Sequence, residues 1–129
     1  MREAIARMSQ GLRADVSVGP HRLVADEPAD VGGGDQGPGP HEYLCAALAS
    51  CTAITLRMYS SRKQWPVESI EVNVGIQKSE SGETTFARVV TLGGNLDAEQ
   101  RARLLDVANK CPVHKTLSGP IKIVTTLAG

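Results

Sequence analysis

Aromatic side chains are scarce in this chain of 129 residues, and the four that it has are spread along its length. Proteins that bind single-stranded nucleic acid stack the bases on aromatic side chains, so this scarcity argues against such a role. A net charge is also absent, because fourteen Lys and Arg residues balance fourteen Asp and Glu residues. No broad electrostatic field therefore draws the chain to a polyanion. We expect no nucleic-acid partner and no membrane partner.

Long apolar runs are missing as well. No stretch approaches the roughly 20 apolar residues that a membrane-spanning helix needs, and Met1 to Gln10 lacks the continuous apolar core of a signal peptide. Cysteine is present in an odd number, three. We therefore expect reduced thiols in a cytoplasmic protein, where a pair of thiols is more often catalytic or metal-binding than structural.

The order of the predicted elements is that of an α+β protein, and the length fits one domain over residues 1–129. The stretch from about His41 to Arg62 has no Gly or Pro, which predicts a long helix after a loop rich in both. Its apolar stripe is predicted to comprise Leu44, Leu48, Cys51, Thr55, Met58 and Tyr59, widened by Ala47 and Ile54. The other predicted elements are hairpin strands at 14–18 and 21–26, hairpin strands at 67–77 and 88–92, a helix capped by Asp97 and Gln100, a helical turn at 112–117 and a final strand at 121–127.

Two cysteines are the strongest candidates for reactive residues. Cys51 lies in the middle of the predicted long helix, and Cys111 opens the sequence Cys-Pro-Val-His. Because proline suits the first turn of a helix, the Cys111 sulfur is expected near free backbone amides, with His114 and Lys115 adding positive charge. Cys111 is therefore predicted to ionise more easily. If the fold brings the two together, one sulfur can attack an oxidant and the other can close a disulfide.

Other interpretations of the same residues stay open. A cysteine on an apolar helix face is often a buried core residue, and we assign Cys45 to that class because it points about 120° away from Cys51 around the helix. A zinc site formed by Cys111 and His114 together with Cys51 and His41 is a second possibility. Strong zinc motifs usually offer two closely spaced ligand pairs, and this sequence has one.

The sequence Gly37 to Ala53, followed by Cys111 to Lys115, resembles the OsmC/Ohr family of osmotically inducible and organic hydroperoxide resistance proteins. The likeness spans nearly the whole chain and is greatest to the smaller OsmC-like branch. It implies an OsmC-like α+β fold in an intertwined homodimer, with antiparallel sheets wrapped around long central helices.

The resemblance also implies a reaction cycle. Cys51 is the peroxidatic nucleophile that reduces a small organic hydroperoxide and becomes a sulfenic acid, and Cys111 resolves it into a Cys51–Cys111 disulfide. A dithiol reductant, lipoyl-protein or thioredoxin-like, then restores both thiols. The cycle needs no metal, haem or flavin cofactor.

In the family, an arginine and a glutamate lie beside the peroxidatic cysteine. The glutamate position, about ten residues before that cysteine, holds His41 here, with Glu42 one place later. Our candidate for the arginine is Arg22. The resemblance thus predicts a cysteine peroxidase with Cys51, Cys111, Arg22, Glu42 and His41 at its site. The alternatives are a non-enzymatic redox sensor or small apolar-ligand binder of the same fold, and a zinc-binding protein.

Overall fold

The computed structural model describes residues 1–8 and 10–129, which form two compact units, Met1–Leu44 and Cys45–Gly129. The boundary lies within the long helix α1 (Pro40–Lys63). Strands and helices occur in separate blocks and all strand pairs are antiparallel, so the predicted α+β class is confirmed. The single domain over residues 1–129 stays a prediction.

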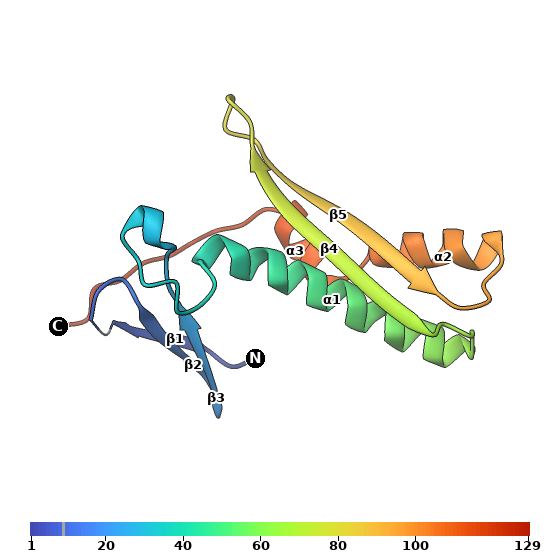
Figure 1. Ribbon diagram of the computed structural model, residues 1–129, viewed down its shortest axis with the longest axis horizontal. Helices are drawn as coiled ribbons and strands as arrows, with labels where there is room; N and C mark the ends of the chain where they lie inside the picture. The colour runs from blue at the N-terminus through green and yellow to red at the C-terminus, as the bar shows by residue number, and fades with distance from the viewer. Residues whose placement is uncertain (9) are drawn as a thin grey trace. The chain divides into compact units, whose positions relative to one another are not determined.

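The first unit contains a three-stranded antiparallel sheet (Figure 1). Strands β2 (Ala14–Val18) and β3 (His21–Ala25) form the predicted hairpin. A further strand, β1 (Ala4–Met8), pairs with the other edge of β2, so that Ala4 lies opposite Val18. The sequence did not predict β1, because its five residues are all exposed and show no alternation between a buried and a solvent face.

The loop after β3 follows the predicted Gly- and Pro-rich segment and contains one short 3-10 turn, η1 (Ala29–Val31). A Cβ atom at Gly37 would overlap the backbone carbonyl of Val24, so this close passage requires glycine. Asp26 is buried, and its carboxylate accepts hydrogen bonds from the amides of Glu27 at 2.8 Å and Gln36 at 3.1 Å. The loop is therefore held by backbone amides that bond a single buried carboxylate.

Helix α1 begins at a proline, as the sequence predicts for the end of a Pro-rich loop. The Glu42 carboxylate accepts a hydrogen bond from the Gly39 amide at 2.8 Å, the reciprocal half of a capping box. One residue later, the Tyr43 hydroxyl donates to the Val24 carbonyl at 2.6 Å. These contacts fix the start of α1 against the strand and loop of the first unit.

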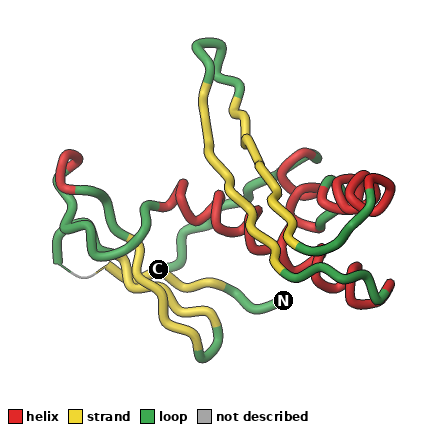
Figure 2. The backbone as a smooth tube through the Cα atoms, turned by 45° about the vertical axis from the view of Figure 1, so that its right-hand side comes forward, coloured by secondary structure: helices red, strands yellow, loops and turns green. Residues whose placement is uncertain are grey.

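The second unit contains the rest of α1, a two-stranded hairpin and two further helices. The hairpin consists of β4 (Ser69–Lys78) and β5 (Thr84–Gly93), and its turn projects beyond the helices (Figures 1 and 2). Helix α2 (Ala98–Ala108) begins with the predicted capping box between Asp97 and Gln100. Helix α3 (Pro112–Ser118) follows with Cys111 as its N-cap residue.

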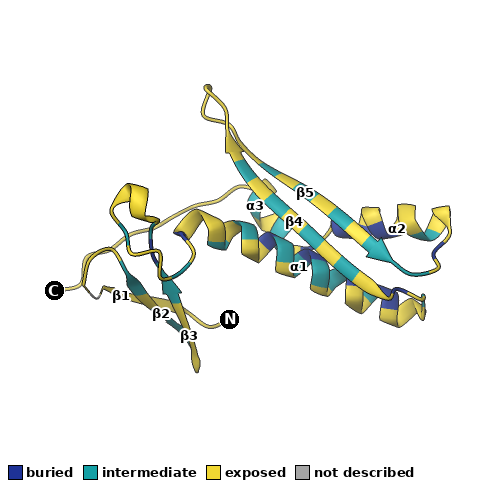
Figure 3. Ribbon diagram, in the orientation of Figure 1, coloured by how far each residue is buried: buried dark blue, intermediate teal, exposed yellow. Residues whose placement is uncertain are grey.

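The apolar core of the second unit lies between α1, α2 and the inner face of the hairpin. Leu56 of α1 and Leu104 of α2 are the largest side chains in it and are almost fully buried. Alternate hairpin residues such as Ile70 and Val90 pack against them. Figure 3 shows the buried positions on α1 and α2. This core fixes the relative positions of the helix that carries Cys51 and the corner that carries Cys111.

The buried face of α1 is partly different from the predicted one. Leu48, Thr52, Leu56 and Ser60 are its buried residues. The predicted stripe is right for Leu48. It is wrong for Leu44 and Ala47, which are exposed, and for Ile54 and Met58, each of which is 59% exposed. The buried face includes two hydroxyl groups, which donate to helix carbonyls one turn earlier, and a search for apolar residues misses such satisfied polar positions.

The predicted final strand at residues 121–127 is wrong. The chain after α3 has no regular secondary structure, and Ile121, Ile123, Val124 and Leu127 are exposed. The alternation of apolar residues is that of a strand, but a strand also needs a neighbour to pair its amides and carbonyls, and no strand of the described chain pairs with this segment. Within residues 1–8 and 10–129, no helix is long and apolar enough to cross a membrane.

Candidate active site

The two cysteines separated by sixty positions in the sequence meet at the corner between α1 and α3. Cys51 lies in the middle of α1, and its sulfur accepts a hydrogen bond from the Val113 amide at 3.5 Å. The Cys111 sulfur accepts one from the His114 amide at 3.4 Å. The side chain of Cys51 also lowers the pKa of the Cys111 thiol, so the two side chains interact. Both are free thiols.

The two thiols differ in exposure. Cys111 is completely buried, with 0% of its surface accessible, whereas Cys51 is half-buried. Cys51 is therefore the more accessible of the two residues to a small molecule from solvent.

Arg88 of β5 reaches across to the Cys111 corner. Its Nη1 atom donates to the Thr52 hydroxyl oxygen at 3.0 Å and to the Cys111 sulfur at 3.9 Å. Its Nη2 atom donates to the Asn109 side-chain oxygen at 2.9 Å and contacts Nδ1 of His114 at 2.9 Å. Each terminal nitrogen carries two N–H groups, so these four partners match the four terminal donors of the guanidinium. The side chain is held from three separate helical segments.

The partners of Arg88 are neutral. Among the residues that the structure describes, no carboxylate lies within ion-pairing distance of its guanidinium. A carboxylate would neutralise the positive charge, whereas hydroxyl, amide and imidazole acceptors orient the guanidinium and leave its charge in place. That charge therefore favours the ionised form of the adjacent buried sulfur.

The pKa of the Cys111 thiol lies below its usual value. Burial alone raises the pKa of this thiol, because a thiolate loses its hydration. Hydrogen bonds from Thr52, from the His114 amide and from Cys51, together with the charge of Arg88, lower the pKa by more than burial raises it. The pKa of the Cys111 thiol is thus lowered by a backbone amide, as the sequence predicts, and by a cation, which is Arg88 and not Lys115.

Thr52 connects Cys111 to the backbone of α1. Its hydroxyl donates to the Leu48 carbonyl at 2.7 Å, and its oxygen lies 3.5 Å from the Cys111 sulfur. A hydroxyl has one proton and can turn it toward either acceptor. A proton turned toward the sulfur would stabilise the thiolate form of Cys111.

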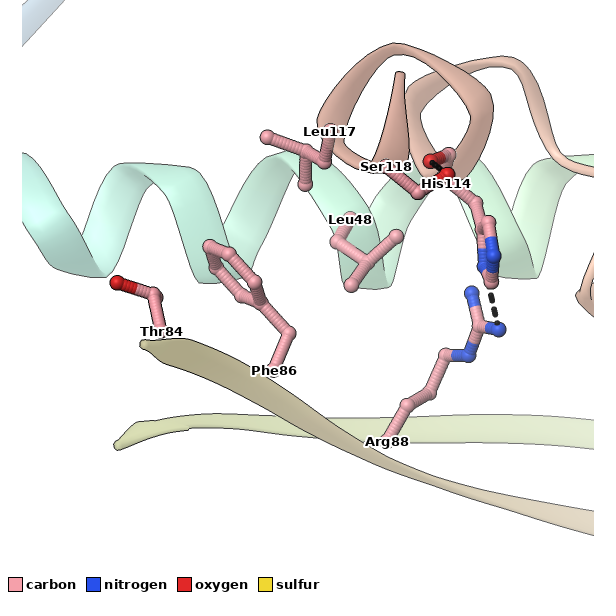
Figure 4. Close-up of a pocket in the computed structure, with 7 residues that line it drawn as sticks. All are labelled: Leu48, Thr84, Phe86, Arg88, His114, Leu117 and Ser118. Atoms are coloured by element: carbon pink, nitrogen blue, oxygen red, sulfur yellow. Dashed lines mark hydrogen bonds between the residues drawn. The ribbon is translucent and has the colours of Figure 1, made fainter. Parts of the chain in front are cut away.

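A cavity of about 250 Å³ adjoins this cluster (Figure 4). Because a guanidinium only donates, Nδ1 of His114 accepts from Arg88, and the neutral ring then carries its proton on Nε2. Figure 4 shows Arg88 and His114 meeting at one end of the cavity and apolar side chains at the other. Neither cysteine is among the lining residues, which are Leu48, Thr84, Phe86, Arg88, His114, Leu117 and Ser118.

Three of the predicted site residues lie in the first unit. Arg22 donates to the carbonyls of Gly19 and His21 at 3.2 and 3.3 Å, within its own hairpin. Glu42 caps the start of α1, as described above, and the exposed His41 lies in the same helical turn. Their membership of the site stays a prediction.

Arg88 is the site residue that the sequence predictions missed. On β5 the alternate residues Phe86, Arg88, Val90 and Leu92 face inward, and the residues between them are exposed. An arginine on the apolar side of an alternating strand is a recognisable signal, because a buried charge must have partners. The alternation on β5 therefore identifies Arg88 as an inward-facing arginine of the second hairpin.

The zinc alternative receives no structural support. No group of three or more His, Cys, Asp or Glu side chains that could hold a metal ion occurs among residues 1–8 and 10–129. His114, one of the proposed ligands, directs Nδ1 at the Arg88 guanidinium. A fixed positive charge beside a donor atom opposes metal binding there.

A family model described as OsmC-like protein matches residues 32–126, which include both cysteines, Arg88 and His114. The chain belongs to the OsmC-like family. This membership confirms the resemblance inferred from the helix around Cys51 and the Cys-Pro-Val-His corner.

Solved structures of other family members share the fold of this OsmC-like protein. An OsmC like protein from Mycoplasma pneumoniae is 19% identical, with a TM-score of 0.78 over 92% of this chain and 88% of that one. The organic hydroperoxide resistance protein OsmC from Legionella pneumophila is 17% identical, with a TM-score of 0.70 over 92% and 90%. OhrB of Bacillus subtilis, an organic hydroperoxide resistance protein, is 21% identical, with a TM-score of 0.64 over 92% and 91%. No curated protein matches the sequence.

Proposed function

We propose that this protein is a thiol-dependent peroxidase that reduces organic hydroperoxides through a Cys51 sulfenic acid and a Cys51–Cys111 disulfide. The observation that carries the proposal is the meeting of a half-buried thiol with a fully buried one whose pKa lies below the usual value for cysteine. Structures that share its fold include proteins named for organic hydroperoxide resistance, which supports the same chemistry.

The half-buried Cys51 is the attacking residue, because solvent-borne peroxide can reach it. Cys51 lowers the pKa of the Cys111 thiol, so the sulfur of Cys111 is a suitable acceptor for the Cys51 proton. As the Cys51 sulfur attacks the distal peroxide oxygen, the O–O bond breaks and the proton passes by way of Cys111 to the departing alkoxide. The products are an alcohol, a Cys51 sulfenic acid and a Cys111 thiolate.

The Cys111 thiolate then attacks the sulfur of the sulfenic acid. The S–S bond forms, and the hydroxyl leaves with a proton from solvent as water. A dithiol of the lipoyl or thioredoxin-like class reduces the disulfide and is itself oxidised to a disulfide. Each turn of the cycle consumes one hydroperoxide and one dithiol and requires no cofactor.

The direct test is dithiol-dependent consumption of tert-butyl and cumene hydroperoxide. We expect turnover by the unmodified protein, a loss to background in Cys51→Ser, and a single round without recycling through a disulfide in Cys111→Ser. Cys45→Ala serves as the matched control, because it removes the third thiol and leaves the pair. An unmodified protein that consumes neither hydroperoxide, or a Cys51→Ser variant with unchanged turnover, contradicts the proposal.

The cavity favours a second candidate function, the binding of a small amphipathic molecule. Apolar side chains of Leu48, Phe86 and Leu117 line it, while Arg88 and His114 supply polar groups at one end. Titration with cumyl alcohol, followed by NMR, tests this function. Binding that persists in Cys51→Ser and weakens in Phe86→Ala supports a binder, whereas unchanged spectra exclude cumyl alcohol as its ligand.

We also infer a homodimer. Ile54 and Met58 lie exposed on α1, and the segment after α3 exposes four large apolar residues without a strand partner. A second copy of the chain can cover these surfaces and pair the unpartnered backbone. Sedimentation or light scattering should report twice the chain mass, and Ile54→Glu combined with Met58→Glu should shift the species toward the monomer. A monomer for the unmodified protein contradicts this inference.

A further inference from the structure

We propose that Arg88 is a positioning residue for the recycling step: it holds the sulfur of Cys111 as the leaving group, so that a dithiol reductant attacks the sulfur of Cys51. The inference rests on the proposed function, because it concerns the disulfide that peroxide reduction leaves behind. It states which of the two sulfurs the reductant meets and which residue directs that choice.

The contacts of Arg88 fix its guanidinium beside one sulfur of the pair. Thr52, Asn109 and His114 hold the terminal nitrogens at 2.9 to 3.0 Å, and Nη1 lies 3.9 Å from the sulfur of Cys111. A planar group with this many fixed hydrogen bonds has little freedom to turn toward Cys51. The positive charge therefore acts unequally on the two sulfurs.

A disulfide breaks more readily when the departing sulfur is the more stable thiolate. At Cys111, the His114 amide and the Thr52 hydroxyl add donors to the charge of Arg88. At Cys51, the Val113 amide donates at 3.5 Å. The negative charge that develops on the departing sulfur is consequently better stabilised at Cys111 than at Cys51.

Access leads to the same direction of attack. The Cys111 sulfur is enclosed, whereas Cys51 is half-buried and faces partly outward. A bulky dithiol such as a lipoyl group must approach the sulfur that it attacks in line with the S–S bond. The sulfur of the half-buried Cys51 then receives the nucleophile, and the buried sulfur of Cys111 departs inward toward Arg88.

The electrons and atoms balance with the dithiol as the reductant. One thiolate of the dithiol bonds to the Cys51 sulfur, the S–S bond breaks, and Cys111 leaves as a thiolate with the electron pair. The second thiol of the reductant loses its proton and attacks its own partner sulfur in the mixed disulfide, which releases Cys51. The reductant ends as an intramolecular disulfide, the protein has gained two electrons, and the thiol protons pass to Cys51 and to solvent.

The direction of attack can be read without peroxide. The disulfide is formed with diamide in a Cys45→Ala background, and glutathione is added briefly as a monothiol, which has no second thiol to resolve the mixed disulfide intramolecularly. The reaction is stopped with acid, the protein is unfolded and alkylated, and the modified residues are mapped by mass spectrometry. We expect glutathione on Cys51 and the alkyl group on Cys111.

The role of Arg88 is tested by the rate at which dithiothreitol reduces the same disulfide. We expect Arg88→Gln to slow this reduction roughly threefold to tenfold, because the departing Cys111 thiolate loses its cation. Arg88→Lys keeps the charge without the fork of donors and should recover part of the rate. Arg62→Gln, which removes an exposed guanidinium from the last turn of α1, is the matched control and should leave the rate unchanged.

A second readout separates positioning from a general structural role. In a Cys45→Ala, Cys51→Ser background, the ultraviolet absorbance of the thiolate follows ionisation of Cys111 alone. Arg88→Gln should raise the pKa of this thiol, and Arg88→Lys should restore part of the shift. Thermal unfolding of each variant shows whether the fold is retained, and Arg88→Lys carries the test if Arg88→Gln does not fold.

Glutathione on Cys111, no disulfide after diamide treatment, or equal reduction rates for Arg88→Gln and Arg62→Gln each overturn the inference. A protein without hydroperoxide turnover that still forms the mixed disulfide on Cys51 has a different meaning. That result contradicts the proposed peroxidase function and leaves the direction of disulfide reduction established.

Discussion

The two units of the chain are stabilised in different ways. In the second unit, large apolar side chains such as Leu56 and Leu104 are almost completely buried. In the first unit, the three strands are largely exposed or half-buried, and Asp26 is the one buried charged residue among those described. The cluster formed by Cys51, Cys111 and Arg88 lies in the unit with the apolar core. The placement of two sulfurs and a guanidinium thus coincides with the unit that buries the larger apolar side chains.

Because of this difference, the two units contribute unequally to the free energy of unfolding. Burial of apolar surface is the dominant favourable term in folding, so the second unit contributes most of it. The first unit depends on strand pairing, on glycine-dependent close passages and on the carboxylate of Asp26. We expect the first unit to open at lower cost than the second, unless a second copy of the chain covers it.

The largest expected effect uses the same substitution in both units. Leu56→Ala removes a side chain with 0% exposure and should lower the free energy of unfolding by about 3 kcal/mol. Leu23→Ala in β3 truncates a side chain that is 39% exposed and should cost less than about 1 kcal/mol. Urea denaturation followed by circular dichroism measures both. Equal losses contradict the comparison and indicate that the first unit buries Leu23 in solution.

Acid should act on the first unit through Asp26. Hydrogen bonds from the amides of Glu27 and Gln36 hold the pKa of its carboxyl below the usual value, although burial raises it. The folded pKa is thus lower than the unfolded one, so the contribution to stability is complete above about pH 3.9 and is lost as pH falls through the folded value.

NMR can follow this titration through the amide shifts of Glu27 and Gln36. We expect their midpoint to lie below that of exposed aspartates, and we expect Asp26→Asn to abolish the transition and loosen the loop. The amides of Val113 and His114 in the second unit should not respond in this pH range. A midpoint at the usual aspartate value contradicts the role given to the buried carboxylate.

A smaller effect, on the pKa of the Cys111 thiol, is expected from a substitution at Thr52 in the second unit. Thr52→Val keeps the shape of a buried side chain and removes the hydroxyl beside Cys111. The pKa of the Cys111 thiol should rise, because the thiolate loses a hydrogen-bond donor and Arg88 loses one of its anchors. Titration of thiolate absorbance in the Cys45→Ala, Cys51→Ser background measures the shift. An unchanged titration removes Thr52 from the electrostatics of the site.

The smallest effect is expected from Cys45→Ala. Cys45 lies on α1 six residues before Cys51, and this spacing directs the two side chains about 120° apart. Hydroperoxide turnover should change less than about twofold, which is the usual limit for substitutions away from a site. A loss comparable to that of Cys51→Ser makes Cys45 part of the reaction and contradicts its assignment as a structural residue.

Features encoded by local sequence could be predicted. The long helix agrees with α1 because a run without Gly or Pro follows a loop rich in both, and the capping box of α2 follows from Asp97 and Gln100. The amide at the Cys111 sulfur could be predicted in the same way, from a proline at the next position. In each case the residues that determine the structure are neighbours in the chain.

Features that depend on partners distant in the sequence could not be predicted. Strand β1 exists because it pairs with β2, and the segment at 121–127 is not a strand because it has no such neighbour in the described chain. Arg88 is placed at the site by its contacts with Thr52 and His114, and no local sequence pattern predicts those contacts. The meeting of Cys51 and Cys111 could be anticipated through family resemblance, and composition or spacing alone left it open.

Because Cys111 is completely buried, its rate of alkylation reports local opening of the second unit. In the reduced, folded protein an alkylating reagent can modify Cys51 directly, whereas it can modify Cys111 only after the second unit opens. The ratio of the two labelling rates therefore measures how often the unit opens. The same protein thus reports its chemistry through one sulfur and its conformational fluctuations through the other.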